Sequence, residues 1–162
     1  MNKFIIYNMD QFDKYFHPIS FAIDEQLITL CAVLSGYLNF SHHKIIVALI
    51  IMALSSSLPD VLSYYDEKIT EKVDKKEAME LALVVFIASI LSTVVVMLPI
   101  IIIKDTKIAI ITSYILMGTI LLLTNYYREK NIYDAAMKLP LYAFVCVITW
   151  FISKLSQKYF KN

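Results

Sequence analysis

Two acidic residues, Asp24 and Asp60, lie inside apolar stretches of this 162-residue chain, where packing alone would not select them. An acid at the centre of a membrane-spanning helix costs about 2.5–3.5 kcal/mol on insertion scales, and such residues usually mark an ion or proton pathway. Asp24 precedes His42 by eighteen residues, and Asp60 follows it by eighteen. If the chain turns back near His42, the two carboxylates lie at the same depth on neighbouring helices. A divalent cation or one shared proton would relieve their repulsion.

Polar neighbours of the two acids extend the candidate site. Glu25 follows the first acid directly, and Ser56 belongs to the run Ser55–Ser57 before the second. We treat Glu25 and Ser56 as secondary contributors to a metal path. Pro59 lacks a backbone donor, so it would free the carbonyl of Ser55. Freed backbone groups at membrane depth are tolerated where they are buried in protein or line a cavity. We therefore expect a helix break at Pro59 and a polar lining formed by the serines.

The positions of Asp24 and Asp60 also have structural explanations, which remain alternatives to a metal or proton pathway. Asp24 could be a first-turn residue of a span that begins at Ile23, where the helix dipole favours an acid. Asp60 could lie at the membrane interface if the second span ends at Leu58. A weaker group of cytosolic acids follows, for which interleaved lysines favour a solvated face over cation binding; its members are Glu67, Glu71, Glu77 and Glu80.

The histidines, cysteines and methionines could supply nitrogen or sulfur ligands to a metal, but their positions in the sequence favour structural roles. His42 and His43 fall in an expected hairpin, which favours solvated side chains over a metal site. Cys31 and Cys146 both lie inside apolar segments. We therefore expect small buried side chains and no disulfide framework. Three methionines inside the spans are expected to serve packing, and these are Met52, Met97 and Met117.

The elements that carry these residues are predicted to be membrane helices. Hydrophobic residues make up 59% of the chain, and its mean hydropathy is +0.64. Soluble domains contain about 45–50% apolar residues even with glycine counted. A spanning helix needs roughly 20 mainly apolar residues, and the sequence lacks the alternation typical of membrane barrels. We predict an all-α integral membrane bundle with five spans, at about residues 19–40, 45–65, 78–103, 108–127 and 139–155, the first being the least apolar.

The segments outside the spans are short. Residues 1–18 are expected to form an amino-terminal cytosolic or interfacial segment, residues 19–156 the transmembrane domain and residues 157–162 a tail. Nine of the fifteen Lys and Arg residues fall on the amino-terminal side of such a bundle, so the positive-inside rule places the amino terminus in the cytosol. The formal charge of +1 predicts no nucleic-acid partner. An enzyme is not expected, because no nucleophile–base pair, phosphate loop or zinc motif stands out.

The order of these features resembles the vacuolar iron transporter family over residues 16 to 155. The segment Ala-Ile-Asp-Glu-Gln-Leu-Ile-Thr at residues 22–29 is similar to the Asn-Asp-Gly-Leu motif of that family, with Asp24 on its aspartate. The segment Ala-Leu-Ser-Ser-Ser-Leu-Pro-Asp-Val at residues 53–61 is similar to the second-span pattern, with Asp60 on the glutamate of the family. Further matches in the third and fourth spans are Leu98-Pro99 and Gly118.

The resemblance implies a five-span homodimer that moves ferrous iron or manganese out of the cytosol in exchange for protons, with no permanently bound cofactor. Several positions depart from the family pattern. Glu25 replaces a glycine, Ser56 replaces the metal-contacting methionine, and Pro59 replaces the glycine before the acid. The cytosolic metal-binding helices are reduced to Asp66–Glu77. Loss of the soft thioether favours a harder or less selective site.

These observations support one leading expectation and one alternative. The leading expectation is a multi-pass transporter of divalent metal, ferrous iron or manganese, coupled to protons and acting as a homodimer in the lipid bilayer. An intracellular membrane, vacuole-like or belonging to a host, would suit that function. The alternative is a non-transporting membrane scaffold or interaction protein derived from such a transporter, which the substituted motif residues favour.

Overall fold

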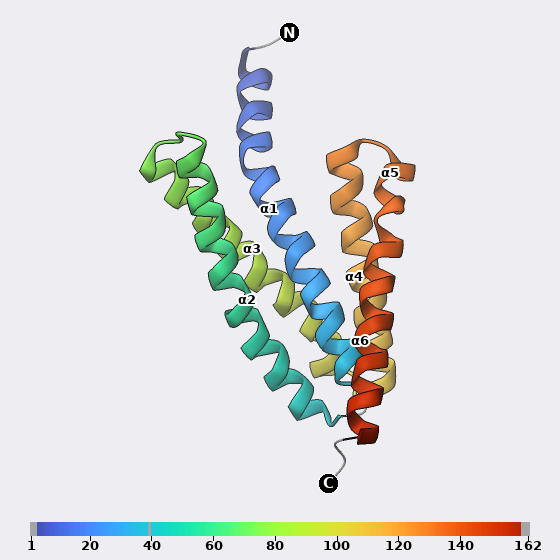
Figure 1. Ribbon diagram of the computed structural model, residues 1–162. Helices are drawn as coiled ribbons and strands as arrows, with labels where there is room; N and C mark the ends of the chain where they lie inside the picture. Colours follow the sequence, from blue (N-terminus) through green and yellow to red (C-terminus); the bar gives the residue numbers. More distant parts are fainter. Residues whose placement is uncertain (1–2, 39, 160–162) are drawn as a thin grey trace.

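The structure, a computed structural model, describes residues 3–38 and 40–159. Its helices are α1 (Lys3–Gly36), α2 (His42–Thr70), α3 (Lys75–Ile102), α4 (Thr106–Glu129), α5 (Ile132–Met137) and α6 (Leu139–Tyr159) (Figure 1). Within these described residues, five stretches are long and apolar enough to cross a membrane, namely Lys14–Gly36, His42–Thr70, Lys75–Ile102, Thr106–Glu129 and Ile132–Ser156. The prediction of an all-helical chain with five membrane-length helices is confirmed, and the first is the least apolar.

The helices run beyond the apolar spans predicted from the sequence. The first helix begins at Lys3 and contains Pro18, so it includes most of the segment set apart as residues 1–18. The expected helix break at Pro59 is not seen, because α2 continues through it to Thr70. A proline removes one hydrogen bond, whereas the turns around it keep theirs and the buried ring of Tyr64 holds the far end of the helix. Residues 1–2 and 160–162 lie outside the described residues.

Short polar residues begin the later helices. The carboxylate of Asp105 accepts hydrogen bonds from the backbone N–H groups of Lys107 and Ile108 at the start of α4. Asp74 caps α3 and Asn131 caps α5 in the same way. Such caps satisfy donors that the first helical turn leaves without partners. The turns between the membrane helices are therefore closed by local polar residues.

The first membrane helix lies at the centre of the bundle. Figure 1 shows α2 and α3 leaning to one side of α1, and α4, α5 and α6 on the other. The helix α1 packs against α2, α3, α4 and α6, and three of its leucines have no exposed surface, Leu27, Leu30 and Leu34. The helices α2 and α3 pack against each other, and both carry small buried residues, such as Ala53, Ser57, Ala82 and Ser89. Small side chains allow helix backbones to approach closely in a membrane.

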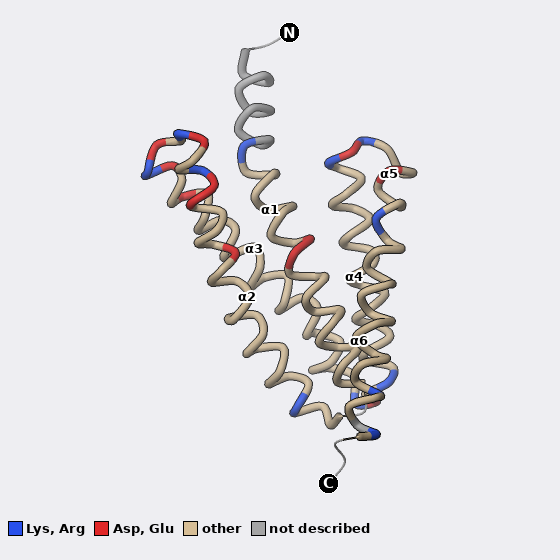
Figure 2. The backbone as a smooth tube through the Cα atoms, viewed as in Figure 1, with Lys and Arg blue, Asp and Glu red and all other residues tan. Residues whose placement is uncertain are grey.

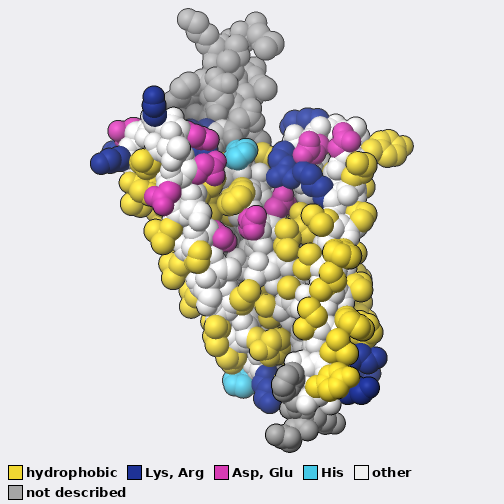
Figure 3. Space-filling view, viewed as in Figure 1, with side chains coloured by type: hydrophobic (Ala, Val, Ile, Leu, Met, Phe, Trp, Pro, Cys, Tyr) yellow, Lys and Arg dark blue, Asp and Glu magenta, His cyan; other side chains and the backbone are white. Residues whose placement is uncertain are grey.

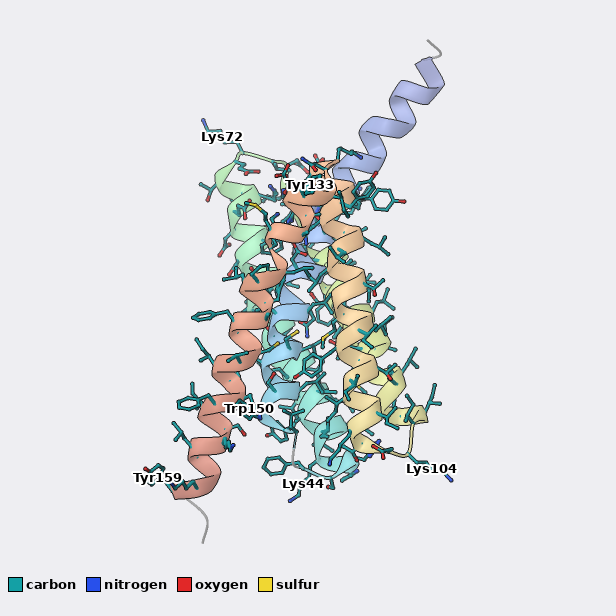
Figure 4. All side chains as sticks on the ribbon, turned by 90° about the vertical axis from the view of Figure 1, so that its right-hand side faces the viewer. Lys44, Lys72, Lys104, Tyr133, Trp150 and Tyr159 are labelled. Carbon is teal, nitrogen blue, oxygen red and sulfur yellow. The ribbon has the colours of Figure 1, made fainter. Side chains whose placement is uncertain are left out.

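Charged residues gather at the two ends of the bundle and apolar side chains cover the region between them (Figures 2 and 3). Figure 4 shows Lys72 and Tyr133 at one end, and Lys44, Lys104 and Tyr159 at the other. The α1–α2 and α3–α4 connections therefore share one end, and the α2–α3 and α4–α5 connections share the opposite end. Large apolar side chains on the outside include Leu62, with 65% of its surface exposed. This distribution is the one expected of a chain whose sides contact lipid.

Candidate functional site

The candidate site is a pair of carboxylates, Glu25 on α1 and Asp60 on α2. In Figure 2 the acidic segment of α1 and the isolated acid on α2 lie at the same level of the bundle. Figure 3 shows acidic side chains across the face between α2 and α6 at this level. Glu25 is exposed and Asp60 is half-buried, and the charge of Asp60 acts on Glu25. These two like charges repel each other, and a bound cation would lower that repulsion.

The third acid, Asp24, has a cation of its own. Its Oδ2 lies 2.9 Å from Nη1 of Arg128 on α4, and the Asp24 side chain is only 14% exposed. The amide of Asn125 lies 3.5 Å from the other carboxylate oxygen, and Arg128 in turn donates to the Asn125 carbonyl oxygen. A guanidinium and an amide therefore neutralise and solvate this acid inside the bundle. Asp24, which the sequence analysis paired with Asp60, thus has Arg128 as its ion-pair partner.

Arg128 and Asn125 are the site residues that the sequence analysis missed. Arg128 was counted only as a positive charge beyond the fourth span, yet α4 continues to Glu129. The usable signal was its position: an arginine at the end of one span and an acid one turn into another lie at the same end of the bundle. Buried acids in membranes usually pair with such a cation.

Gln26 joins three helices below the carboxylates. Its side chain has no exposed surface. Its amide nitrogen donates to Thr93 Oγ1 on α3 at 3.0 Å, and its carbonyl oxygen accepts from Ser56 Oγ on α2 at 3.0 Å. The sequence analysis assigned no role to Gln26. The hydrogen bonds instead fix the relative height of α1, α2 and α3, and therefore of Glu25 and Asp60.

Replacing Gln26 with leucine is expected to lower the free energy of unfolding by about 1 kcal/mol, the scale of hydrogen bonds between membrane helices. The loss stays modest because Ser56 and Thr93 also donate to carbonyls of their own helices. Unfolding can be followed in detergent by the fluorescence of Trp150, the one tryptophan. A double-mutant cycle with Thr93→Val should show coupling, whereas strict additivity of the two losses would contradict the direct bond.

The three consecutive serines do not form one polar lining, contrary to expectation. Ser55 is exposed and donates to the carbonyl of Ile51. Ser57 is fully buried and donates to the carbonyl of Ala53. Ser56 reaches the neighbouring helix, at Gln26. Successive residues of a helix are separated by about 100°, so three in a row cannot share one face.

The weaker acidic candidates lie at the end of the bundle with the α2–α3 connection, and they pair with basic or phenolic groups. Glu71 and Glu67 contact the ammonium of Lys68 at 2.7 and 3.4 Å. Glu77 lies 2.7 Å from the ammonium of Lys14, and Glu80 accepts a hydrogen bond from the phenol of Tyr15. The last two contacts join α3 to α1. These carboxylates therefore serve the surface and the helix contact, and each of them already has a partner.

His42 and His43 lie at the opposite end, and His42 has a structural partner for each ring nitrogen. Its Nε2 donates to the carbonyl of Ile103 at 2.9 Å, and its Nδ1 accepts from the hydroxyl of Thr106 at 2.7 Å. His42 thus connects the start of α2 to the α3–α4 turn. Within the described part of the chain, no group of three or more His, Cys, Asp or Glu residues could hold a metal ion.

Comparisons of this chain with protein-family models, curated proteins and solved structures give no match. Functional inference therefore rests on the geometry of its own residues. The arrangement offers the ion pair Asp24–Arg128 and the two carboxylates Glu25 and Asp60, on the same level of a membrane-length bundle. Chemically, the carboxylate pair can take up a cation or a proton.

Proposed function

We propose that this chain is a multi-pass membrane transporter of a divalent cation, ferrous iron or manganese, and that Glu25 and Asp60 hold the ion in transit. The observation that carries the proposal is that the charge of Asp60 on α2 acts unfavourably on the charge of Glu25 on α1, at a level where both helices carry acidic residues. Among the described residues, no Lys or Arg forms an ion pair with either of them. A divalent ion matches their summed charge, and carboxylate oxygens suit such hard or borderline metals.

The second part of the proposal concerns Asp24 and Arg128. Arg128 neutralises the charge of Asp24 while no metal is bound at the carboxylate pair. Movement of α4 relative to α1 would release Asp24 as a further ligand next to Glu25. Protons would replace the metal on the acids in the return step, which couples transport to protons. The guanidinium acts as an internal counter-ion that keeps a buried acid tolerable when no metal is present.

The proposal also includes a homodimer with a vacuolar iron transporter-like arrangement and a cytosolic amino terminus. Two carboxylates are fewer ligands than a hard divalent cation takes, because such ions bind six or more oxygen atoms. A second copy facing the side between α2 and α6 would bring its own Glu25 and Asp60 to the same path. Water molecules and the hydroxyl of Ser56, which already lies against α1, would complete the ligand set.

The test is manganese or ferrous iron flux into proteoliposomes that contain the purified chain. The double variant Glu25→Gln, Asp60→Asn is expected to lower the flux at least tenfold, since it removes both negative charges and keeps the side-chain shapes. The matched control is Asp66→Asn, Asp134→Asn, which removes two exposed carboxylates at the same end and should leave the flux unchanged. Equal flux in wild type and in the Glu25, Asp60 variant would overturn the proposal.

A non-transporting scaffold is the second candidate, and a specific observation favours it. Asp24, the acid matched to the family motif, is already neutralised by Arg128. A scaffold needs no metal, so its thermal unfolding should not respond to Mn²⁺. A rise in midpoint with Mn²⁺ that disappears in Glu25→Gln, Asp60→Asn would exclude the scaffold as the sole role.

A further inference from the structure

Three sulfur atoms from three different helices meet inside the bundle. The thiol of Cys31 on α1 lies 3.8 Å from the thioether sulfur of Met117 on α4. Cys146 on α6 packs against the core cluster that contains both of these residues, and its thiol interacts with that of Cys31. Cys31 and Met117 are buried, with 5% and 1% of their surfaces exposed, and both cysteines are free thiols. This sulfur cluster of Cys31, Met117 and Cys146 is distinct from the carboxylate pair, because Cys31 lies six residues beyond Glu25, about 9 Å along the helix.

Hydroxyl groups lie against the sulfur cluster. Ser35 is one turn beyond Cys31 on α1, and its Oγ is 2.7 Å from the phenol oxygen of Tyr114 on α4. Ser35, Tyr114 and Cys146 line the same pocket. Groups of this kind orient sulfur ligands and stabilise negative charge on them. The cluster is therefore more than an apolar contact between two small side chains.

We propose that Cys31, Cys146 and Met117 form a binding site for a soft monovalent cation of the copper(I) class, held by three sulfur atoms. Thiolate and thioether ligands select such ions over the hard divalent cations that suit carboxylates. For a metal–sulfur bond of about 2.3 Å, a trigonal site places its sulfur atoms about 4 Å apart. The distance between Cys31 Sγ and Met117 Sδ already fits that geometry at 3.8 Å.

The charges and protons of the site balance in a defined way. One Cu⁺ replaces the two thiol protons of Cys31 and Cys146, because the thiolate is the metal ligand. The bound site then carries one negative charge, which faces the hydroxyls of Ser35 and Tyr114. A zinc ion would prefer four ligands of nitrogen, oxygen or thiolate type. Three sulfurs, one of them a thioether, favour the softer ion.

Cys146 is the sulfur through which an ion would reach the site. It is half-buried and lines a surface pocket between α1, α4 and α6, together with Ser35, Tyr114 and Trp150. Cys31 and Met117 lie behind it. A donor molecule would therefore deliver the ion to Cys146 first, and the two buried sulfurs would complete the coordination without a change in the helix arrangement.

The test uses the purified full chain in detergent, reduced and kept free of oxygen, with Cu⁺ competed against a coloured copper(I) chelator and Ag⁺ as a redox-inert probe. One ion per chain, two protons released per ion and a shell of three sulfur atoms in X-ray absorption are expected. Cys31→Ser and Cys146→Ser should each weaken binding at least about 100-fold, and Met117→Leu about tenfold, by the loss of a soft ligand. Met97→Leu is the control, because Met97 is a buried methionine of the same core outside the cluster.

Three results would overturn the site. The first is binding that is unchanged in all three ligand variants while circular dichroism shows them folded. The second is an absorption spectrum without a three-sulfur shell in the wild-type protein. The third is Zn²⁺ binding as tight as that of Cu⁺. Since none of these measurements involves Glu25 or Asp60, failure here leaves the proposed transport of divalent metal untouched, and failure of transport leaves this site untouched.

Discussion

Replacing Arg128 with methionine is expected to lower the free energy of unfolding by about 3 kcal/mol, the lower end of the range for breaking a buried ion pair. The Asp24 side chain would keep 14% exposure and lose the cation 2.9 Å from it. The lower end applies because Arg128 keeps 30% exposure, so water can partly replace it. Thermal and denaturant unfolding in detergent, followed by Trp150 fluorescence, would measure the change.

Two matched variants separate the ion pair from a general loss of charge. Lys130→Met removes an exposed cation two residues away, whose ammonium lies over the ring of Tyr127, and should change stability by less than about 0.5 kcal/mol. Asp24→Asn combined with Arg128→Met removes the stranded charge and should recover a large part of the loss. If the double variant is no more stable than Arg128→Met, the pairing with Asp24 is not the cause.

The Arg128→Met variant also probes the proposed transport site. Without Arg128, a divalent cation becomes the available counter-ion for Asp24, next to Glu25. Mn²⁺ should therefore raise the unfolding midpoint of Arg128→Met more than that of the wild type, since a ligand stabilises the state that binds it better. An equal or smaller shift would mean that Asp24 does not join the metal ligands, even if Glu25 and Asp60 do.

Replacing Leu30 with alanine is expected to lower the free energy of unfolding by about 2–5 kcal/mol, the range for buried leucines. Leu30 has no exposed surface and lies on α1, which packs against four other helices. A cavity at this position lies among side chains from several helices and cannot be filled by lipid. The measurement is again unfolding in detergent, with helix content checked by circular dichroism.

Leu123→Ala is the matched control for Leu30→Ala. Leu123 on α4 has 53% of its surface exposed, so it faces lipid or detergent in the folded and unfolded states alike. The same truncation should there cost less than about 0.5 kcal/mol, because apolar solvent fills the vacated space. Equal losses at the two positions would contradict the central place of α1.

The sequence predicts the membrane helices well because long apolar runs have few alternatives in a bilayer. The predicted range 108–127 agrees closely with α4, whose true ends are set by the Asp105 cap and by Lys130. The lysine adopts a left-handed conformation (φ 56°), a role that usually falls to glycine, of which the chain has only two. Hydropathy does not register such caps, so helix ends were predicted less well than helix centres.

The candidate site was predicted in part. Counting from the hairpin placed acids of α1 and α2 at a common level, where Figure 2 shows them. The count did not predict which acid of α1 interacts with Asp60. Neighbouring side chains of a helix point about 100° apart, and the packing of α4 decides which of the two acids on α1 becomes buried. Asp24 forms an ion pair with Arg128, and Glu25 is the acid on which the charge of Asp60 acts. Which side chains pair between helices that are far apart in sequence depends on tertiary packing. The spacing of residues along the chain does not predict it.

The central position of α1 also has a consequence for how the protein is made. The acid Asp24 is synthesised more than a hundred residues before Arg128, an interval of roughly 5–20 s at ordinary rates of translation. During that time the least apolar helix of the five has to stay at the translocon or in the bilayer without its counter-ion. A nascent chain arrested after α3 would expose this unpaired acid to the machinery that retains unassembled membrane proteins. Arrival of α4 is thus the step that makes α1 a stable part of the membrane.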